Sequence, residues 1–166
     1  MKVELKNIKF SEQLSEETNA FFANIYIDGK KSGYCKNDGC GGCTEYHPYP
    51  ERKQLFEECE EWLKTQPQIN IGTDEQPYMV NCNMENMIDH LFTEWLKLRD
   101  KKKLEKQMET RLMWGVPNGY SYGYYNFKKP LNTFDRRLIQ QYIDKIKLSL
   151  KDGEQILNTN LVGFDL

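Results

Sequence analysis

Apolar residues in the middle of the chain recur every three or four positions. They begin at Met84 and reach Leu98, a spacing that places them on one face of a helix. Beyond Leu98 the same face carries mostly lysine and glutamate. We therefore predict a long helix from Met84 to Met113, capped by Asn83, whose second half either projects from the domain or breaks near residues 100–103.

The first fifty residues alternate between apolar and polar positions, which is the pattern of half-buried strands. The clearest run, from Phe21 to Ile27, is apolar at every second position. Asp28-Gly29 follows it and is a strong hairpin signal, because glycine accepts the positive φ of a tight turn. Strands are predicted at residues 2–10, with an irregularity before Ile8, and at residues 19–28, 31–36 and 44–49.

Further periodic segments predict two more helices and a last strand. One helix begins at Pro50 and ends before Pro67, and another begins near Thr133, capped by Asn132 or Thr133. Residues 154–166 predict an edge strand, and Tyr78 to Val80 is strand-like. Together these elements indicate an α+β fold, with a small antiparallel sheet, mainly in the N-terminal half, packed against about three helices, one of them long.

Charge is distributed unevenly along a single predicted domain of 166 residues, in which 39% of residues are hydrophobic. Residues 1–82 form an acidic sheet-plus-helix lobe, residues 83–151 a basic helical lobe with an aromatic loop, and residues 152–166 a strand-like tail. The overall net charge of −2 conceals this asymmetry. A basic lobe suits a polyanion or an acidic protein surface, although the two lobes could equally neutralise each other.

The N-terminus lacks the apolar core of a signal peptide, and no stretch approaches the length of a membrane span. We therefore expect an intracellular protein, in the cytoplasm of a bacterial host cell, that does not bind a membrane. The five cysteines are then expected to be reduced thiols or metal ligands.

Three of these cysteines and a histidine lie within thirteen residues. Cys35, Cys40, Cys43 and His47 have the spacing C-x4-C-x2-C-x3-H, and these are the side chains that a tetrahedral zinc site uses. Zinc is thus one possible cofactor, although the spacing matches no standard finger. The alternatives are a glycine-rich turn with incidental thiols, and a thiol enzyme in which His47 activates Cys43. We expect no enzymatic activity and no catalytic residues.

The segment from Trp114 to Lys129 is rich in aromatic residues and glycines, and basic residues lie before and after it. Tyrosine beside lysine suits stacking on nucleobases together with phosphate contacts, and equally suits a protein interface. The alternative is a strand in which Tyr120, Tyr122 and Tyr124 point one way and the opposite side packs on the sheet. The predicted binding residues are Lys97, Arg99, Lys101, Lys102, Lys103, Lys106, Arg111, Trp114, Tyr120, Tyr122, Tyr124, Tyr125, Lys128, Lys129, Arg136 and Arg137.

The runs Thr18–Phe21, Ile25–Lys31, Gly33-Tyr34 and Lys36–Thr44 resemble the opening of small proteins carried by phages and mobile elements of bacteria. The likeness continues more weakly through Trp114–Gly119 and covers about half of the chain. Proteins of that setting are often accessory or anti-defence factors, including inhibitors of RNA-guided nucleases. The resemblance brings no assigned catalytic residues.

Three hypotheses follow. The first is a non-enzymatic, anti-CRISPR-like binding protein that inhibits a bacterial defence ribonucleoprotein by binding the nuclease or its guide RNA. The second is an accessory module of a mobile element that binds RNA or DNA directly. The third is a small zinc-binding protein or thiol enzyme built on Cys35 to His47. A variant of the first hypothesis is that the glutamate-rich helix of the acidic lobe mimics nucleic acid and binds a basic channel of the nuclease.

Overall fold

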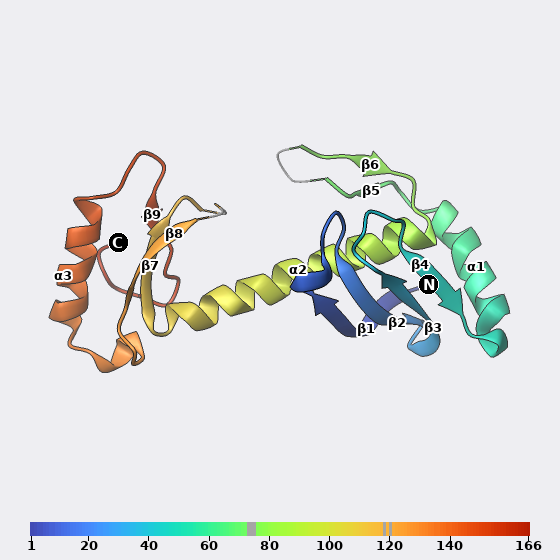
Figure 1. Cartoon of the computed structure of the whole chain (residues 1–166), viewed down its shortest axis with the longest axis horizontal. Helices are drawn as coiled ribbons and strands as arrows, with labels where there is room; N and C mark the ends of the chain where they lie inside the picture. The colour runs from blue at the N-terminus through green and yellow to red at the C-terminus, as the bar shows by residue number, and fades with distance from the viewer. Residues whose placement is uncertain (73–75, 118, 120) are drawn as a thin grey trace. The chain divides into compact units, whose positions relative to one another are not determined.

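The computed structural model of the chain describes residues 1–72, 76–117, 119 and 121–166. It has an α+β fold with a four-stranded antiparallel sheet in the N-terminal half and three α-helices, so the predicted fold class is confirmed (Figure 1). The chain consists of two compact units, Met1–Leu96 and Lys97–Leu166. Whether they behave as a single domain stays a prediction.

The sheet of the first unit contains strands in the order β1-β2-β3-β4, each antiparallel to its neighbour. Asp28 and Gly29 both have positive φ, 47° and 75°, which confirms the predicted tight hairpin. The predicted irregularity is a break in register between Lys6 and Lys9, with Asn7 at a φ of 54°. The strand bounds are β1 Val3–Ser11, β2 Ala20–Ile27, β3 Lys30–Asn37 and β4 Glu45–Pro48.

One face of this sheet is covered by α1 and by the first turns of α2 (Figure 1). Ala23, Ile25 and Ile27 of β2 meet Phe56 of α1 and Ile88 of α2 in the core. The helical segments of this unit are η1 Glu12–Leu14, η2 Pro50–Arg52, α1 Lys53–Lys64 and the start of α2 Met84–Met108. A short hairpin pairs β5 Ile69–Asn70 with β6 Met79–Val80.

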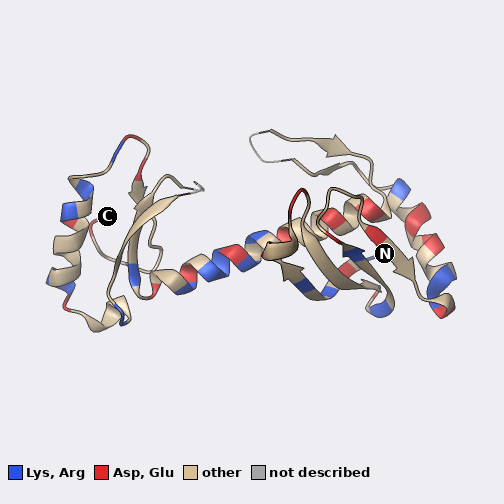
Figure 2. Ribbon diagram, in the orientation of Figure 1, with Lys and Arg blue, Asp and Glu red and all other residues tan. Residues whose placement is uncertain are grey.

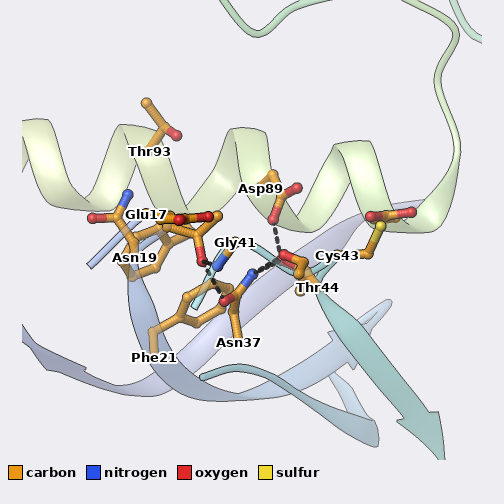
Figure 3. A pocket seen from close by; sticks show the side chains of 13 residues that line it. Glu17, Asn19, Phe21, Asn37, Gly41, Cys43, Thr44, Asp89 and Thr93 are labelled. Carbon is orange, nitrogen blue, oxygen red and sulfur yellow. Dashed lines mark hydrogen bonds between the residues drawn. The ribbon is translucent and has the colours of Figure 1, made fainter. Parts of the chain in front are cut away.

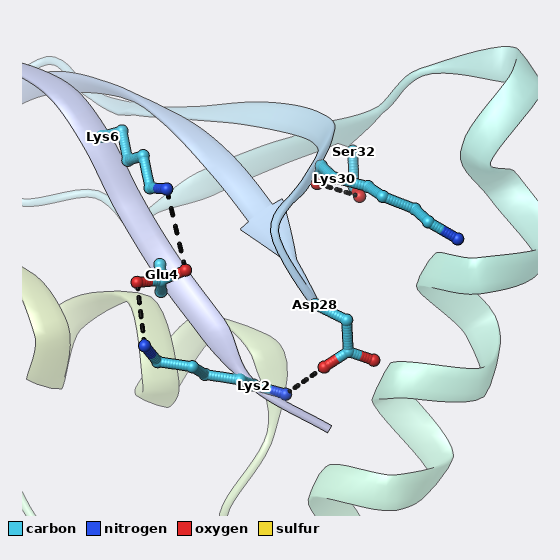
Figure 4. Close-up of polar contacts among 6 residues, drawn as sticks. All are labelled: Lys2, Glu4, Lys6, Asp28, Lys30 and Ser32. Carbon is cyan, nitrogen blue, oxygen red and sulfur yellow. Dashed lines mark hydrogen bonds and ion pairs between the residues drawn. The ribbon is translucent and has the colours of Figure 1, made fainter.

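The β2–β3 turn makes hydrogen bonds to Lys2, the residue that precedes β1. The Asp28 carboxylate accepts a hydrogen bond from the backbone nitrogen of Lys2 at 2.7 Å, and the Asp28 backbone nitrogen donates to the Lys2 carbonyl at 2.9 Å. Glu4 lies between Lys2 and Lys6, with its carboxylate 3.0 and 3.8 Å from their ammonium groups (Figure 4). The hydrogen bond from Lys2 lowers the pKa of Glu4.

The long helix begins as predicted, because the Asn83 side chain accepts a hydrogen bond from the backbone nitrogen of Asn86 at 2.8 Å. It runs without a break through residues 100–103 but ends at Met108, so the predicted end at Met113 is wrong. Leu112 and Met113 instead lie in a strand and are both fully buried. Pairing on both edges of that strand satisfies its backbone and outweighs the local helical spacing.

The second unit is built on a sheet in the order β8-β7-β9. The segment predicted as an aromatic loop is therefore largely a β-hairpin, which agrees with the alternative prediction of a strand in this segment. The last helix begins at Arg136, and its cap is Asp135, whose carboxylate accepts from the Arg137 nitrogen at 2.7 Å; the predicted caps Asn132 and Thr133 are wrong. The bounds are β7 Arg111–Gly115, β8 Tyr122–Asn126, η3 Leu131–Thr133, α3 Arg136–Lys147 and β9 Gln155–Ile156, the last much shorter than predicted.

Candidate nucleic-acid interface

The β7–β8 hairpin divides its aromatic residues between two faces. Trp114 lies opposite Gly123, and Leu112 lies opposite Tyr125. A side chain at Gly123 would collide with the Trp114 ring, so glycine lets the indole lie flat against β8. Tyr125 contacts the ring of Tyr142 on α3, with 5.1 Å between centroids. Trp114 therefore belongs to the packing between the sheet and α3, whereas Tyr125 lies beside Tyr142 and remains 40% exposed.

Tyr122 and Tyr124 point to the opposite face of the hairpin, together with Arg111. The two tyrosines are 40% and 48% exposed. The guanidinium carbon of Arg111 lies 4.5 Å from the centre of the Tyr124 ring, a cation–π distance. An arginine and two tyrosines thus form an exposed cluster with fixed geometry.

Gln107, in the last turn of α2, ties this cluster to the helix. Its side-chain oxygen accepts hydrogen bonds from Arg111 at 3.0 Å and from the Tyr122 hydroxyl at 3.1 Å. Lys103 lies four residues before Gln107 and is its neighbour on the helix surface, and Lys106 is in turn a neighbour of Lys103. We call Lys103, Lys106, Arg111, Tyr122 and Tyr124 the basic–aromatic face.

The remaining basic residues of α2 lie elsewhere around the helix. Lys101 and Lys102 are exposed, but the helical period turns them away from the side that carries Gln107. Lys97 is also exposed, and Arg99 is half-buried beside Asp100 at 3.6 Å. Basic and acidic residues alternate along this part of the helix (Figure 2). Residues 97–166 contain 14 Lys and Arg against 8 Asp and Glu, a net charge of +6.

Other predicted binding residues lie beyond this face. Lys128 and Lys129 are exposed in the turn after β8, where Lys128 has a φ of 58°. Arg136 and Arg137 are exposed in the first turn of α3, and Arg136 donates to the Gly163 carbonyl. Tyr120 lies outside the described residues. The structure therefore brings together only part of the predicted set.

The four predicted zinc ligands do not converge. Cys35 pairs with Tyr46 and points into the core, whereas His47 pairs with Tyr34 and points to the other side of the sheet. The Cys35 thiol lies 3.7 Å from the Ala23 carbonyl, and burial raises its pKa to about 12. Among the described residues, no three His, Cys, Asp or Glu side chains are grouped so that they could hold a metal ion.

The thiol-enzyme alternative requires an accessible thiolate. Cys43 is exposed, but a hydrogen bond with Glu85 and the charge of that carboxylate raise its pKa. The neutral thiol is thereby favoured, which is the opposite of what nucleophilic catalysis needs. His47 packs against Tyr34, with 4.9 Å between ring centroids.

A pocket of about 460 Å³ in the first unit was not predicted (Figure 3). Thr44 donates to the Asp89 carboxylate at 2.6 Å and accepts from the Asn37 amide at 3.3 Å, which joins the loop between β3 and β4 to α2. Burial raises the pKa of Asp89. Thr44 and Asp89 are 45 residues apart, so no local pattern points to this contact.

Within the described ranges, none of the helices combines the length and the apolar character needed to cross a membrane. No protein-family model, curated protein or solved structure matches the chain.

Proposed function

We propose that this chain is a non-enzymatic binding protein that holds RNA on its basic–aromatic face. The observation that carries the proposal is the cluster of Arg111, Tyr122 and Tyr124 fixed by Gln107 beside the lysines of α2. Its tyrosine rings are exposed on the face of the hairpin opposite to Trp114, which packs against the core of the second unit. Exposed rings held next to cations are suited to unstacked bases and phosphates.

The electrostatic part of this binding comes from lysine and arginine. Lys103, Lys106 and Arg111 offer three positive charges beside the tyrosines, within a unit of net charge +6. Each phosphate that such a residue neutralises releases condensed counterions, so the affinity falls steeply as salt rises. Stacking on tyrosine adds a contribution that depends less on salt.

The biological role in the proposal is inhibition of a bacterial defence ribonucleoprotein, such as an RNA-guided nuclease, in the host cytoplasm. By covering its guide RNA, or the protein surface that handles the guide, the chain would block the complex without chemistry of its own. Support for this step comes from the resemblance of residues 18–44 to small phage and mobile-element proteins. Direct RNA or DNA binding by an accessory module would use the same face.

The test compares two charge-reversal variants of the same helix. Lys103→Glu with Lys106→Glu reverses the face, whereas Lys97→Glu with Lys101→Glu makes the same charge change on lysines of the same helix that neighbour neither Lys103 nor Lys106. Affinity for a labelled guide RNA is measured by fluorescence anisotropy, and inhibition by target cleavage with an RNA-guided nuclease loaded with that guide.

We expect the first variant to lose affinity about tenfold or more and to lose inhibition, while the second variant loses much less. Equal losses in both variants would remove the assignment to this face. RNA binding without inhibition of any tested nuclease would favour the accessory module over the inhibitor.

A further inference from the structure

The face of the N-terminal sheet turned away from the helices carries aromatic residues in register with one another. Phe22, Asn24 and Tyr26 alternate with the core residues of β2. Cross-strand partners share a face of the sheet. Phe22 therefore lies between Lys9 and Lys36, Asn24 between Lys6 and Tyr34, and Tyr26 between Glu4 and Lys31. We call these residues, with Glu45, His47 and Tyr49, the outer sheet face.

The aromatic rings of this face form a continuous row from β2 to the end of β4. The centroids of Phe22 and Tyr34 are 5.7 Å apart with their planes 24° from parallel, and Tyr34 is 4.9 Å from His47 and 6.4 Å from Tyr49. Phe22 remains 38% exposed. A side chain at Gly33 would collide with the His47 carbonyl, so glycine permits the close approach of β3 and β4 that brings these rings together.

Lysines surround the row of rings. The ammonium of Lys6 lies 4.5 Å from the centre of the Tyr26 ring, and that of Lys31 lies 5.5 Å from the centre of the Tyr49 ring. Lys36 is paired with Glu45 at 2.9 Å.

The net charge of this face is opposite in sign to the net charge of the unit that carries it. Residues 1–96 contain 9 Lys and Arg against 17 Asp and Glu, a net charge of −8. Four of these nine basic residues nevertheless lie on the outer sheet face, against the two carboxylates of Glu4 and Glu45. This face therefore carries four basic residues against two acidic ones within an acidic unit, and the other five basic residues of the unit lie elsewhere.

We propose that the outer sheet face binds single-stranded nucleic acid. Bases stack on Phe22, Tyr34 and His47, and the surrounding lysines contact the phosphates. A duplex hides the flat surfaces of its bases, so the exposed rings of Phe22 and His47 in this row favour the single strand. This site goes beyond the function proposed above, because it shares no residue with the basic–aromatic face.

The probe is a fluorescein-labelled oligouridine of about ten nucleotides, titrated at about 50 mM salt and followed by anisotropy. Phe22→Leu with Tyr34→Leu removes two rings and keeps apolar bulk, and Lys9→Glu with Lys31→Glu reverses two charges. Lys53→Glu with Lys64→Glu is the matched control, because both lysines are exposed on α1. Circular dichroism melting shows whether each variant is folded.

We expect each of the two face variants to bind oligouridine about tenfold more weakly or worse, and the α1 control to bind within about twofold of the unmodified protein. Unchanged affinity in both face variants, or an equal loss in the control, would overturn the proposal. If Lys103→Glu with Lys106→Glu abolishes oligouridine binding while both sheet variants bind normally, the outer sheet face is excluded and the basic–aromatic face stands.

Photocrosslinking gives an answer that does not depend on how a variant folds. Oligouridine substituted with 5-iodouracil is bound to the unmodified protein, irradiated and digested, and the crosslinked peptides are identified by mass spectrometry. We expect adducts on peptides that contain Phe22, Tyr34 or His47. Adducts confined to residues 97–166 would contradict the proposal.

Discussion

The guanidinium group of Arg111 lies over the ring of Tyr124, with 4.5 Å between the guanidinium carbon and the ring centre. Arg111 also donates to Gln107, so the arginine joins the exposed hairpin to the end of α2. This arrangement leaves one side of the Arg111–Tyr124 pair partly open, since Tyr124 is 48% exposed. A bound base can therefore stack beside a cation that is already in place.

Replacing Tyr124 with leucine should weaken RNA binding. Loss of one stacking ring costs about 1–3 kcal/mol of binding free energy. Tyr124→Phe keeps the ring and should bind RNA nearly as tightly as the unmodified protein, as measured by anisotropy. If Tyr124→Leu and Tyr124→Phe bind equally well, Tyr124 does not stack on RNA.

Gly39 holds the loop between β3 and β4 against the segment after η1. Its φ is 90°, a side chain would collide with the Leu14 carbonyl, and its own carbonyl accepts hydrogen bonds from the backbone nitrogens of residues 16–18. Gly39→Ala should therefore lower the free energy of unfolding by on the order of 3 kcal/mol. Gly42→Ala is the control, because no atom lies within 4 Å of its added methyl group, and it should change stability by less than about 1 kcal/mol. Urea titration distinguishes the two, and equal effects would contradict this description of the loop.

The five cysteines should differ in their reaction with a thiol reagent in the native protein. Cys40 and Cys43 are exposed, while burial raises the pKa of Cys35 to about 12 and that of Cys59 to about 11. Cys40 and Cys43 should react with Ellman's reagent in the folded protein, and Cys35, Cys59 and Cys82 only after unfolding. Because Glu85 raises the pKa of Cys43, Glu85→Gln should speed its reaction near neutral pH. A rate for Cys43 that Glu85→Gln leaves unchanged would show that this contact is absent in solution.

Asp89 should make the first unit less stable as the pH rises. Burial raises its pKa in the folded state above the ordinary value of 3.8, so the folded state holds the proton more tightly than the unfolded chain. The resulting stabilisation is present in acid below the unfolded-state pKa and is lost as the pH passes the folded-state pKa.

Asp89→Asn removes this titration and can still accept the hydrogen bond from Thr44. Its stability relative to the unmodified protein should therefore be greater at neutral pH than in acid, as measured by chemical denaturation. Glu51→Gln alters an exposed carboxyl group and serves as the control. A stability difference for Asp89→Asn that does not vary with pH would contradict the assignment.

The elements of the first unit were predictable because their signals are local. Asp28-Gly29 specifies a turn, the alternation of β2 specifies which residues face the core, and Asn83 caps α2 in the predicted way. The end of α2 was not predictable in this way. Leu112 continues the helical spacing from Met108, and only its pairing with Tyr125 of β8 makes it part of a strand.

The candidate sites were predictable in composition but not in arrangement. The sequence identifies Tyr122, Tyr124 and Tyr125 as aromatic residues near cations, but only the β7–β8 register shows that Tyr125 lies on the α3 side of the hairpin and the other two on the side of Arg111. The outer sheet face depends in the same way on register, because Phe22, Tyr34 and His47 come from three strands. The spacing of Cys35 and His47 suggested a shared metal, and the pleat of the sheet places them on opposite sides.

RNA binding is assigned above to Lys103, Lys106 and Arg111 with their neighbouring tyrosines. The most direct measurement is the affinity of the unmodified protein for a labelled structured RNA by fluorescence anisotropy at about 50 mM and about 150 mM salt. We predict tight binding at low salt that weakens by about tenfold or more at the higher salt, and a smaller salt dependence in the Lys103→Glu, Lys106→Glu variant. No binding at low salt would contradict the claim and would make the basic–aromatic face an anchor for a protein partner.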